Sequence, residues 1–150
     1  MHVKSIVLLL ASGLFISCNA KRKKPAPAVE KNGTDTLIHC YGYTGNGDTV
    51  WLTLAPGDSE RTGTLLYDLE GKDKNTGTIR GQLQKELLIA NYTFMSEGVQ
   101  SVRQVIFKLK ENYLVEGFGE IVTRNDSVFF RNIDSLQYND AMKLTKRACQ

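Results

Sequence analysis

One stretch, residues 63–98, constrains the fold of this chain more than any other. It contains two segments that begin alike, residues 63–65 and 77–79, on either side of a polar cluster at residues 70–75. Strand-forming residues that alternate on both sides of such a Gly/Asp/Asn cluster are typical of a β-hairpin. A third run of strand formers, residues 87–94, follows after a short gap. The stretch therefore predicts a meander of three antiparallel strands.

The sequence on both sides of the meander continues the pattern of short strands. Before it we predict strands at residues 35–43 and 49–54, joined by the Asn46-Gly47 pair, which is the strongest short-range hairpin signal. No long stretch shows the 3.6-residue period of an amphipathic helix, so the chain is predicted to be all-β. Further strands are predicted at residues 101–109, 114–121 and 127–130, with residues 142–144 as a last strand or, alternatively, a helical turn from Asn139.

Eight or nine short strands with tight turns predict an antiparallel up-and-down meander that closes into a small barrel. A barrel is favoured over a sandwich because every connection looks local, whereas a Greek key needs a long crossover. Glycines inside the predicted strands, at Gly81, Gly117 and Gly119, fit the strong coiling of such a barrel. A barrel of about eight strands has an interior that is either filled by side chains or holds one small ligand.

Residues 1–17 read as a secretory signal peptide with an apolar segment at residues 6–16. This segment is too short to be a transmembrane helix. Ser17 and Cys18 follow, and this junction resembles the lipobox of bacterial lipoproteins, in which the cysteine is acylated and becomes the new N-terminus. Phe15 departs from that pattern, since leucine is usual at its position. The alternative is ordinary cleavage nearby, which would leave a soluble periplasmic protein with a free thiol.

A lipid-anchored flexible linker, residues 18–34, is predicted between the leader and a β-barrel domain at residues 35–150. The basic run at residues 21–24 either binds anionic headgroups or only keeps the tether soluble. Pro25 and Pro27 stiffen the spacer. We therefore expect a protein that is lipid-anchored in the cell envelope, at the outer membrane, with a barrel that faces the periplasm or the cell surface.

The distribution of charge argues against a nucleic-acid partner. Five of the 19 basic residues lie before residue 25, which leaves 14 basic residues against the 16 acidic residues. The predicted domain is thus close to neutral, whereas a nucleic-acid-binding domain carries its basic charge on the folded surface. The expected partners are the membrane, through the N-terminal lipid, and a small molecule or another envelope protein.

Cys40 and Cys149 remain as a pair once Cys18 carries lipid. They lie in the first predicted strand and at the chain end, which are the two edges that meet when a barrel closes. Since the cell envelope is oxidising, a disulfide is expected. No metal site is predicted, because His39, the only histidine after the leader, neighbours Cys40 on a strand and points to the opposite face. No cofactor is predicted either, because the sequence contains no phosphate-binding loop.

The lipobox, the predicted barrel and the end-to-end cysteines together resemble a family of small lipoproteins of Gram-negative bacteria with a lipocalin-like barrel. The likeness covers residues 35–150 and rests on the sequence segments at residues 72–78, 92–98 and 115–120. The resemblance implies no established activity. A looser likeness is to the lipocalin-like barrel of the copper-stress envelope lipoproteins. This sequence lacks their Cys-x-x-Cys motif, so their metal or redox role is not implied.

One polar constellation stands out on the predicted strands. Arg103 lies on the apolar face of its strand, and a buried charge must be paired. If residues 111–112 form a two-residue loop, Arg103 faces Glu120 across the hairpin, close enough for an ion pair. Such a pair is either a structural bridge or the polar end of a ligand pocket. The same register pairs Leu109 with Leu114, Phe107 with Glu116 and Val105 with Phe118. The candidate ligand-binding residues are Tyr67, Tyr92, Arg103, Glu116 and Glu120.

No catalytic residues are predicted, and we expect the protein not to be an enzyme. No serine lies in a Gly-x-Ser-x-Gly elbow. Glu116 and Glu120 on one strand would lie about 13 Å apart, which is too far for a retaining glycosidase pair. The leading hypothesis is a membrane-tethered, non-enzymatic barrel that binds a small ligand or an envelope partner. The alternative is a structural or accessory lipoprotein with a solid barrel that acts through its outer surface.

The lipid anchor can be tested directly. Replacing Cys18 by serine should abolish incorporation of labelled palmitate and release the protein into the soluble fraction, because the acylated residue is lost. Fractionation of cells that express the full chain, with and without the substitution, measures both effects. Unchanged labelling and continued membrane association of Cys18→Ser would contradict the lipoprotein prediction.

Overall fold

The computed structural model of the protein describes residues 36–149. The predicted signal peptide, residues 1–17, and the predicted linker, residues 18–34, lie outside the described residues.

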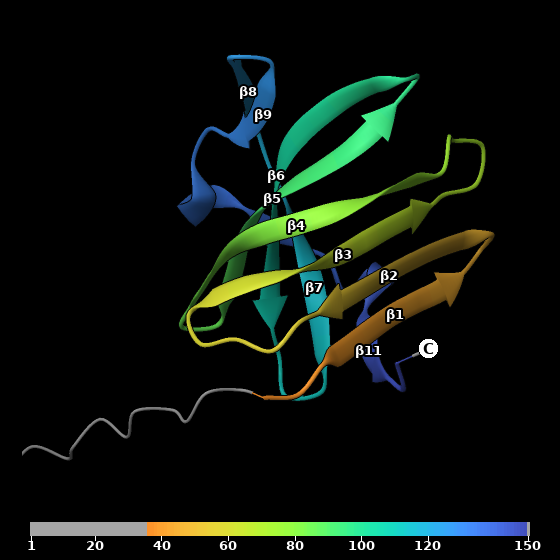
Figure 1. The fold of residues 1–150 in the computed structure, drawn as a ribbon, viewed down its shortest axis with the longest axis vertical. Coiled ribbons are helices and arrows are strands. Elements are labelled where there is room, and N and C mark those ends of the chain that lie inside the picture. Colours follow the sequence, from red (N-terminus) through yellow and green to blue (C-terminus); the bar gives the residue numbers. More distant parts are fainter. Residues whose placement is uncertain (1–35, 150) are drawn as a thin grey trace, which may run out of the picture. The chain divides into compact units, whose positions relative to one another are not determined.

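The described chain is all-β, with eleven strands and two short 3₁₀ helices (Figure 1). Most strands follow one another as hairpins, as the sequence predicts. The strands of the first half are β1 (His39–Gly45), β2 (Asp48–Leu54), β3 (Glu60–Asp68), β4 (Asn75–Gln84), β5 (Leu87–Ser96) and β6 (Val99–Leu109). The remaining elements are β7 (Tyr113–Phe118), β8 (Ile121–Arg124), β9 (Ser127–Phe130), η1 (Ile133–Ser135), β10 (Gln137–Tyr138), η2 (Asp140–Met142) and β11 (Leu144–Arg147).

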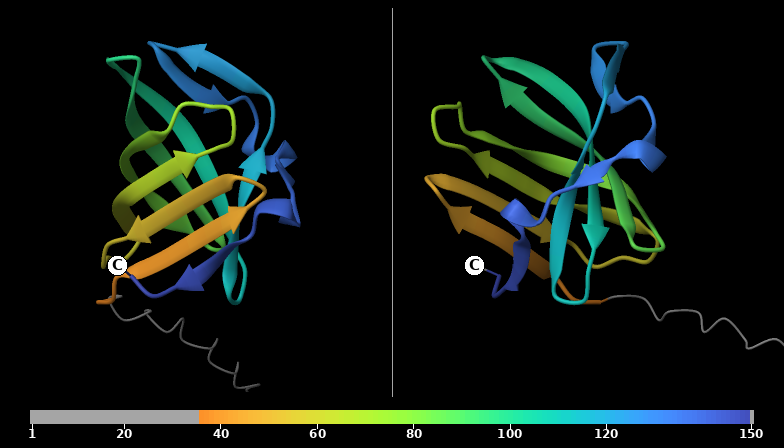
Figure 2. Two further views of the ribbon diagram at one scale, coloured as in Figure 1. Left: turned by 90° about the vertical axis from the view of Figure 1, so that its right-hand side faces the viewer. Right: turned by 180° about the vertical axis from the view of Figure 1, so that it is seen from behind.

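Eight of these strands close into an antiparallel barrel, which confirms the predicted fold class. Strands β1 to β7 pair in chain order, and β11 pairs with both β7 and β1. The two views in Figure 2 show β11 beside β1, with the described C-terminal end next to the start of β1. The expected local connectivity is wrong at one point. The chain between β7 and β11 forms β8, β9 and β10, and β9 pairs with β6 in parallel.

The last strand resolves an alternative that the sequence left open. A strand at residues 142–144 and a helical turn from Asn139 were predicted as alternatives. The structure has the turn, η2, which includes Met142, and then a strand that begins only at Leu144. The Asn139 side chain accepts a hydrogen bond from the backbone N–H of Ala141 at 2.8 Å and so caps η2. β11 then begins at Leu144, whose side chain is buried in the core.

The first hairpin forms at the predicted Asn46-Gly47 pair. Asn46 has φ 53° and Gly47 has φ 81°, and positive φ at both central positions is the requirement of a type I′ turn. The register that results pairs Gly45 with Asp48 and places Val50 and Leu52 inside the barrel.

Two glycines of β4 permit the close approach of β5. A Cβ atom on Gly77 would lie 2.0 Å from the Thr93 carbonyl oxygen, and one on Gly81 would lie 2.0 Å from the Ile89 carbonyl oxygen. No side chain fits there without movement of the backbone, so both positions require glycine. A Cβ on Gly117 would instead meet the side chains of the segment that crosses β7 through β10.

The middle of the barrel is filled by apolar side chains. Alternate residues point inward, as the period of two in the sequence predicts. Seven of the eight barrel strands contribute buried residues to this cluster, and Tyr41 and Tyr43 of β1 are partly buried against it. The buried residues are Val50, Leu52, Leu54, Leu65, Tyr67, Ile79, Leu88, Ala90, Tyr92, Val105, Phe107, Leu114 and Leu144. The interior is therefore solid at its centre, and open space is confined to positions nearer the two ends.

The expected disulfide joins Cys40 and Cys149, with 5.3 Å between their Cα atoms. Cys40 lies in β1 opposite Arg147, the last residue of β11, so the bond links the two strands that close the barrel. The closed loop spans 109 residues of sequence separation. In the chain-entropy account, a loop of this size reduces the conformational freedom of the unfolded chain considerably.

Removing the disulfide should destabilise the barrel strongly. For the double variant Cys40→Ser/Cys149→Ser we expect the free energy of unfolding to fall by about 4 kcal/mol, the range for a loop of roughly a hundred residues. Urea denaturation of the purified chain measures the change, and Cys18→Ser, which retains the disulfide, is the matched control. A denaturation midpoint that is insensitive both to the double substitution and to a reductant would contradict this prediction.

Candidate functional site

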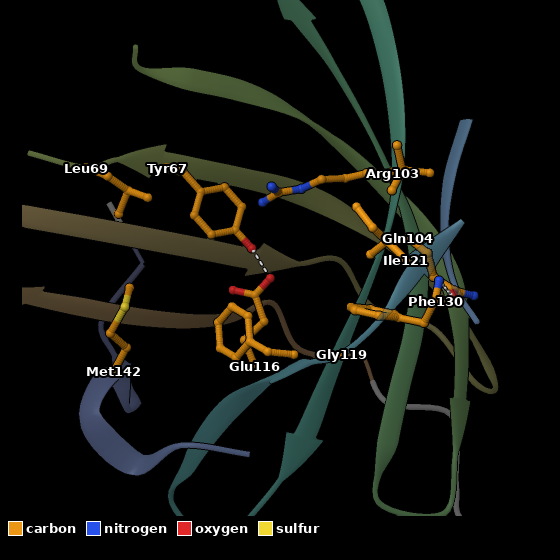
Figure 3. Close-up of a pocket in the computed structure, with 11 residues that line it drawn as sticks. Tyr67, Leu69, Arg103, Gln104, Glu116, Gly119, Ile121, Phe130 and Met142 are labelled. Carbon is orange, nitrogen blue, oxygen red and sulfur yellow. Dashed lines mark hydrogen bonds between the residues drawn. The ribbon is translucent and has the colours of Figure 1, made fainter. Parts of the chain in front are cut away.

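Four of the five predicted ligand-binding residues come together inside one end of the barrel. They are Tyr67 on β3, Tyr92 on β5, Arg103 on β6 and Glu116 on β7. All four occupy inward positions, and Tyr92 and Arg103 face each other across the β5–β6 pair. Figure 3 shows the Arg103 side chain directed toward the Tyr67 ring and the Tyr67 hydroxyl directed toward Glu116.

Glu120 is not part of this group, and the predicted Arg103–Glu120 pair is wrong. The register of the hairpin is correct near its loop, where Leu109 pairs with Leu114 and Phe107 pairs with Glu116. The pairing of β6 with β7 ends there. Glu120 follows the end of β7 and instead forms an exposed ion pair with Arg131, whose Nε lies 2.9 Å from Oε1.

The site exists because β6 and β7 separate beyond Glu116. Val105 and Phe118 were predicted to pair but do not, because each strand takes a new neighbour at this level. β6 pairs with β9 at Val102 and Arg103, and β7 pairs with β10 at Gly117 and Phe118. The edges of β6 and β7 are therefore no longer joined to each other here. Side chains of the β8–β9 hairpin complete the barrel wall between them.

A cavity of about 320 Å³ lies where β6 and β7 separate. Its polar groups are few, and most of its wall is apolar. The Gln104 side chain ties the hairpin to the barrel, because its Oε1 accepts a hydrogen bond from the backbone N–H of Phe130 at 3.1 Å. The residues that line the cavity are Tyr67, Leu69, Arg103, Gln104, Glu116, Phe118, Gly119, Ile121, Val128, Phe130 and Met142.

Sequence reasoning did not find the apolar part of this lining. Ile121, Val128 and Phe130 lie on a hairpin whose position depends on one parallel pairing with β6. Met142 lies in η2, which reaches the site only after the chain has crossed β7. The alternation of Ile121 with Val128 and Phe130 on one face of the hairpin was visible in the sequence, but nothing in it indicated what that face covers.

Tyr67 and Glu116 form a hydrogen-bonded pair at the inner end of the cavity. The Tyr67 hydroxyl donates to Glu116 Oε1 at 2.8 Å. Burial raises the pKa of Glu116 above its ordinary value, while the hydrogen bond from Tyr67 and the charge of Arg103 oppose that shift. Burial, and then the neighbouring Glu116 carboxylate, raise the pKa of Tyr67 well above its ordinary value. The hydroxyl of Tyr67 is thus a proton donor at physiological pH.

Arg103 lies in a cage of aromatic rings. Its guanidinium carbon is 4.7 Å from the centroid of the Tyr67 ring, 5.5 Å from that of Tyr92 and 5.9 Å from that of Phe94. The Tyr92 and Phe94 rings stack with centroids 4.7 Å apart, which fixes this side of the cage. Cation–π contacts stabilise a guanidinium that is partly removed from water. Among residues 36–149, no carboxylate lies at ion-pair distance from Arg103.

A second, smaller cavity of about 100 Å³ lies on the other side of Arg103. Two buried polar atoms here, Tyr92 Oη and Arg103 Nε, have no hydrogen-bond partner within the described chain. Burial raises the pKa of Tyr92 to about 12, so its hydroxyl keeps its proton at physiological pH. The lining consists of Tyr67, Leu69, Lys72, Asp73, Asn75, Tyr92, Phe94 and Arg103.

These groups supply hydrogen-bond donors and acceptors together with one fixed cation. Within residues 36–149 no cluster of three or more histidine, cysteine or acidic side chains has the arrangement of a metal site. His39 lines a separate cavity with Leu54, Leu83 and other residues, and it does not line the cavity around Arg103. The site can orient a ligand through one guanidinium, two phenolic hydroxyls and one carboxyl group.

Comparisons with protein-family models, with curated proteins and with solved structures find no match to this chain. In the part of the chain that the structure describes, no helix has the length and apolar character that a membrane crossing needs.

Replacing Glu116 by glutamine should flatten the dependence of stability on pH. Because the folded-state pKa of Glu116 is raised, the folded protein holds this proton more tightly than the unfolded chain does. The free energy of unfolding of the wild type should therefore fall as the pH rises from the ordinary pKa of 4.5 through the raised folded value, by at most about 1.4 kcal/mol per pH unit. The glutamine keeps an acceptor for Tyr67 but does not ionise.

Urea denaturation across this pH range compares the wild type with Glu116→Gln. Glu120→Gln, which removes an exposed carboxylate, is the control and should follow the wild-type curve closely, since exposed ion pairs contribute little. Parallel curves for the wild type and Glu116→Gln would show that burial of Glu116 has no effect on its ionisation.

Proposed function

We propose that this chain is a membrane-tethered envelope lipoprotein whose non-enzymatic barrel binds a small ligand in the cavity between β6, β7 and the β8–β9 hairpin. The observation that carries the proposal is the cavity itself, about 320 Å³ with an apolar wall and a few convergent polar groups. Ligand sites in proteins have about 300–1,000 Å³ and the same composition, so this volume favours a small ligand.

The tether and the envelope location rest on the sequence of the leader. The apolar segment at residues 6–16 and the Ser17-Cys18 junction support lipidation of Cys18. The Cys40–Cys149 disulfide is consistent with an oxidising compartment outside the cytoplasm. The resemblance to small lipoproteins of Gram-negative bacteria with a lipocalin-like barrel supports the same location.

Binding is favoured over catalysis because of what lines the cavity. Its polar side chains are Arg103, Gln104, Glu116 and Tyr67, and no serine, cysteine, histidine or lysine is among the lining residues. A serine, cysteine or lysine nucleophile with a histidine base is therefore missing from this lining. Glu116 is hydrogen-bonded to Tyr67, which suits a group that orients a ligand.

A small ligand is favoured over the alternative of a solid barrel that acts through its outer surface. A solid barrel has an interior filled at both ends, whereas here the inward faces of Arg103 and Glu116 border open volume. Phe118 is 50% exposed and Ile121 is 57% exposed at the rim of that volume. A ligand in the cavity would remove part of this apolar surface from water, and that burial favours binding.

Blocking the cavity tests the proposal. The neutral fluorophore N-phenyl-1-naphthylamine should bind the full chain with one molecule per barrel and an increase in emission. Val128→Trp places a large side chain in the cavity wall and should weaken this binding at least about tenfold, since the apolar volume is lost. Val122→Trp is the matched control, because Val122 lies on the same hairpin opposite Phe129, on the face away from the cavity.

Circular dichroism and the intact disulfide verify that both variants fold. Equal affinity of Val128→Trp and Val122→Trp, or no binding by the wild type, would contradict a ligand site in this cavity.

A further inference from the structure

The two cavities described above meet at the same side chains. Tyr67, Leu69 and Arg103 line both the apolar cavity of about 320 Å³ and the polar one of about 100 Å³. A single elongated ligand could therefore occupy both, with Arg103 beside the junction. The apolar part of such a ligand would lie against the β8–β9 hairpin, and its polar end would lie under the β3–β4 loop, which contributes Lys72 and Asp73.

The groups around the polar cavity favour a ligand with hydrogen-bond acceptor atoms. Arg103 Nε is a buried N–H that can only donate, and it makes no hydrogen bond within the described chain. The Tyr92 side chain is completely buried, and its hydroxyl is likewise without a partner. A buried donor without an acceptor is costly, and oxygens of an anion would satisfy both groups together.

The charges around the site also favour an anion. Within the described chain, Arg103 has no carboxylate at ion-pair distance. Lys72 adds a second cation to the lining of the smaller cavity, and Asp73 on the same exposed loop carries the opposite charge. Glu116 lies on the side of the larger cavity, and its Oε1 already accepts from Tyr67. Both atoms that lack partners can thus donate, and one oxygen of Glu116 already accepts a hydrogen bond.

The geometry points to an amphiphilic acid as the ligand class: a carboxylate or phosphate group bound by Arg103 and Tyr92, with an apolar chain in the cavity beneath the β8–β9 hairpin. This assignment rests on the proposed function and adds the chemical class of the ligand to it. The modest volume favours one short chain over a large lipid.

A set of probes that differ only in the head group tests the assignment. Displacement of N-phenyl-1-naphthylamine from the full chain measures the affinities of decanoate, decyl phosphate, decan-1-ol and decyltrimethylammonium. At least one of the two acids should bind about tenfold or more tightly than the alcohol and the ammonium compound, because only an acid pairs with Arg103. Acetate and inorganic phosphate, which lack the chain, should bind at least about tenfold more weakly than the corresponding long-chain acid.

Two substitutions separate binding from stability. Arg103→Gln should weaken binding of the acids about tenfold or more and leave the alcohol nearly unaffected, whereas Arg131→Gln, which removes an exposed cation, should change neither. Tyr92→Phe deletes the unpartnered buried hydroxyl. It should weaken acid binding about fivefold while the thermal midpoint stays unchanged or rises, since no hydrogen bond of the unliganded protein is lost. A purely structural role for Tyr92 would lower the thermal midpoint instead.

The outcomes distinguish this inference from the proposed function. Equal or tighter binding of the alcohol or the ammonium compound would overturn the acidic ligand class and leave a small-molecule site in place. Binding of acetate or phosphate as tight as that of the long-chain acids would overturn the amphiphile and leave an anion site. If neither the fluorophore nor any chain compound binds, the proposed function fails as well. Should Arg103→Gln not fold, Tyr92→Phe alone decides the role of the polar cavity.

Discussion

β11 pairs with β1 along one side and with β7 along the other, and these two ladders turn a curved sheet into a closed barrel. Without β11, both neighbours would present unpaired backbone groups to solvent. Only three residue pairs join β1 to β11 and two join β11 to β7. Such short ladders close the barrel weakly, and the Cys40–Cys149 disulfide lies directly beside them. The covalent bond therefore reinforces the barrel where its hydrogen bonding is sparsest.

The barrel is built differently at its two ends. Near the Glu111-Asn112 turn, β6 and β7 form a regular hairpin, and the Leu114 and Phe107 side chains are buried in the interior. Beyond Glu116 the strands separate and the β8–β9 hairpin takes the place of a continuous wall. This part of the wall depends on pairings between segments that are distant in sequence. The cavity thus lies where the regular β6–β7 ladder has ended.

Local features of the fold could be predicted from the sequence. The Asn46-Gly47 turn, the strand at residues 127–130 and the inward alternation from Val50 to Leu54 each depend on neighbouring residues and on the period of two. The end-to-end disulfide could be inferred as well, because the two cysteines lie on the two edges that meet when the barrel closes and can pair only with each other. The turn, the strand and the alternation need no knowledge of distant parts of the chain, whereas the disulfide follows only once barrel closure is assumed.

The candidate site was only partly predictable, for a related reason. The group was identified from Arg103, a charged residue on an apolar strand face that needs a partner, together with the acidic and tyrosine residues predicted near it. The partner of Arg103 was assigned wrongly, since a constant register was extended past Glu116, where the structure ends the β6–β7 ladder. No local rule marks that end. It depends on β9 and β10 occupying the free edges, and such pairings between distant segments leave no periodic signal in the sequence.

The position of Arg103 is most easily understood as a compromise between stability and binding. A guanidinium that is partly withdrawn from water loses hydration, and aromatic faces return only part of it, about 0.5–2 kcal/mol for each favourable contact. An apolar residue at this position would fill the barrel end and avoid both the unpartnered Nε of Arg103 and the open volume around it. Functional sites commonly retain groups that the isolated fold does not need. The same two donors that weaken the empty barrel are those an acidic ligand would satisfy, so loss of stability and gain of affinity arise from the same atoms.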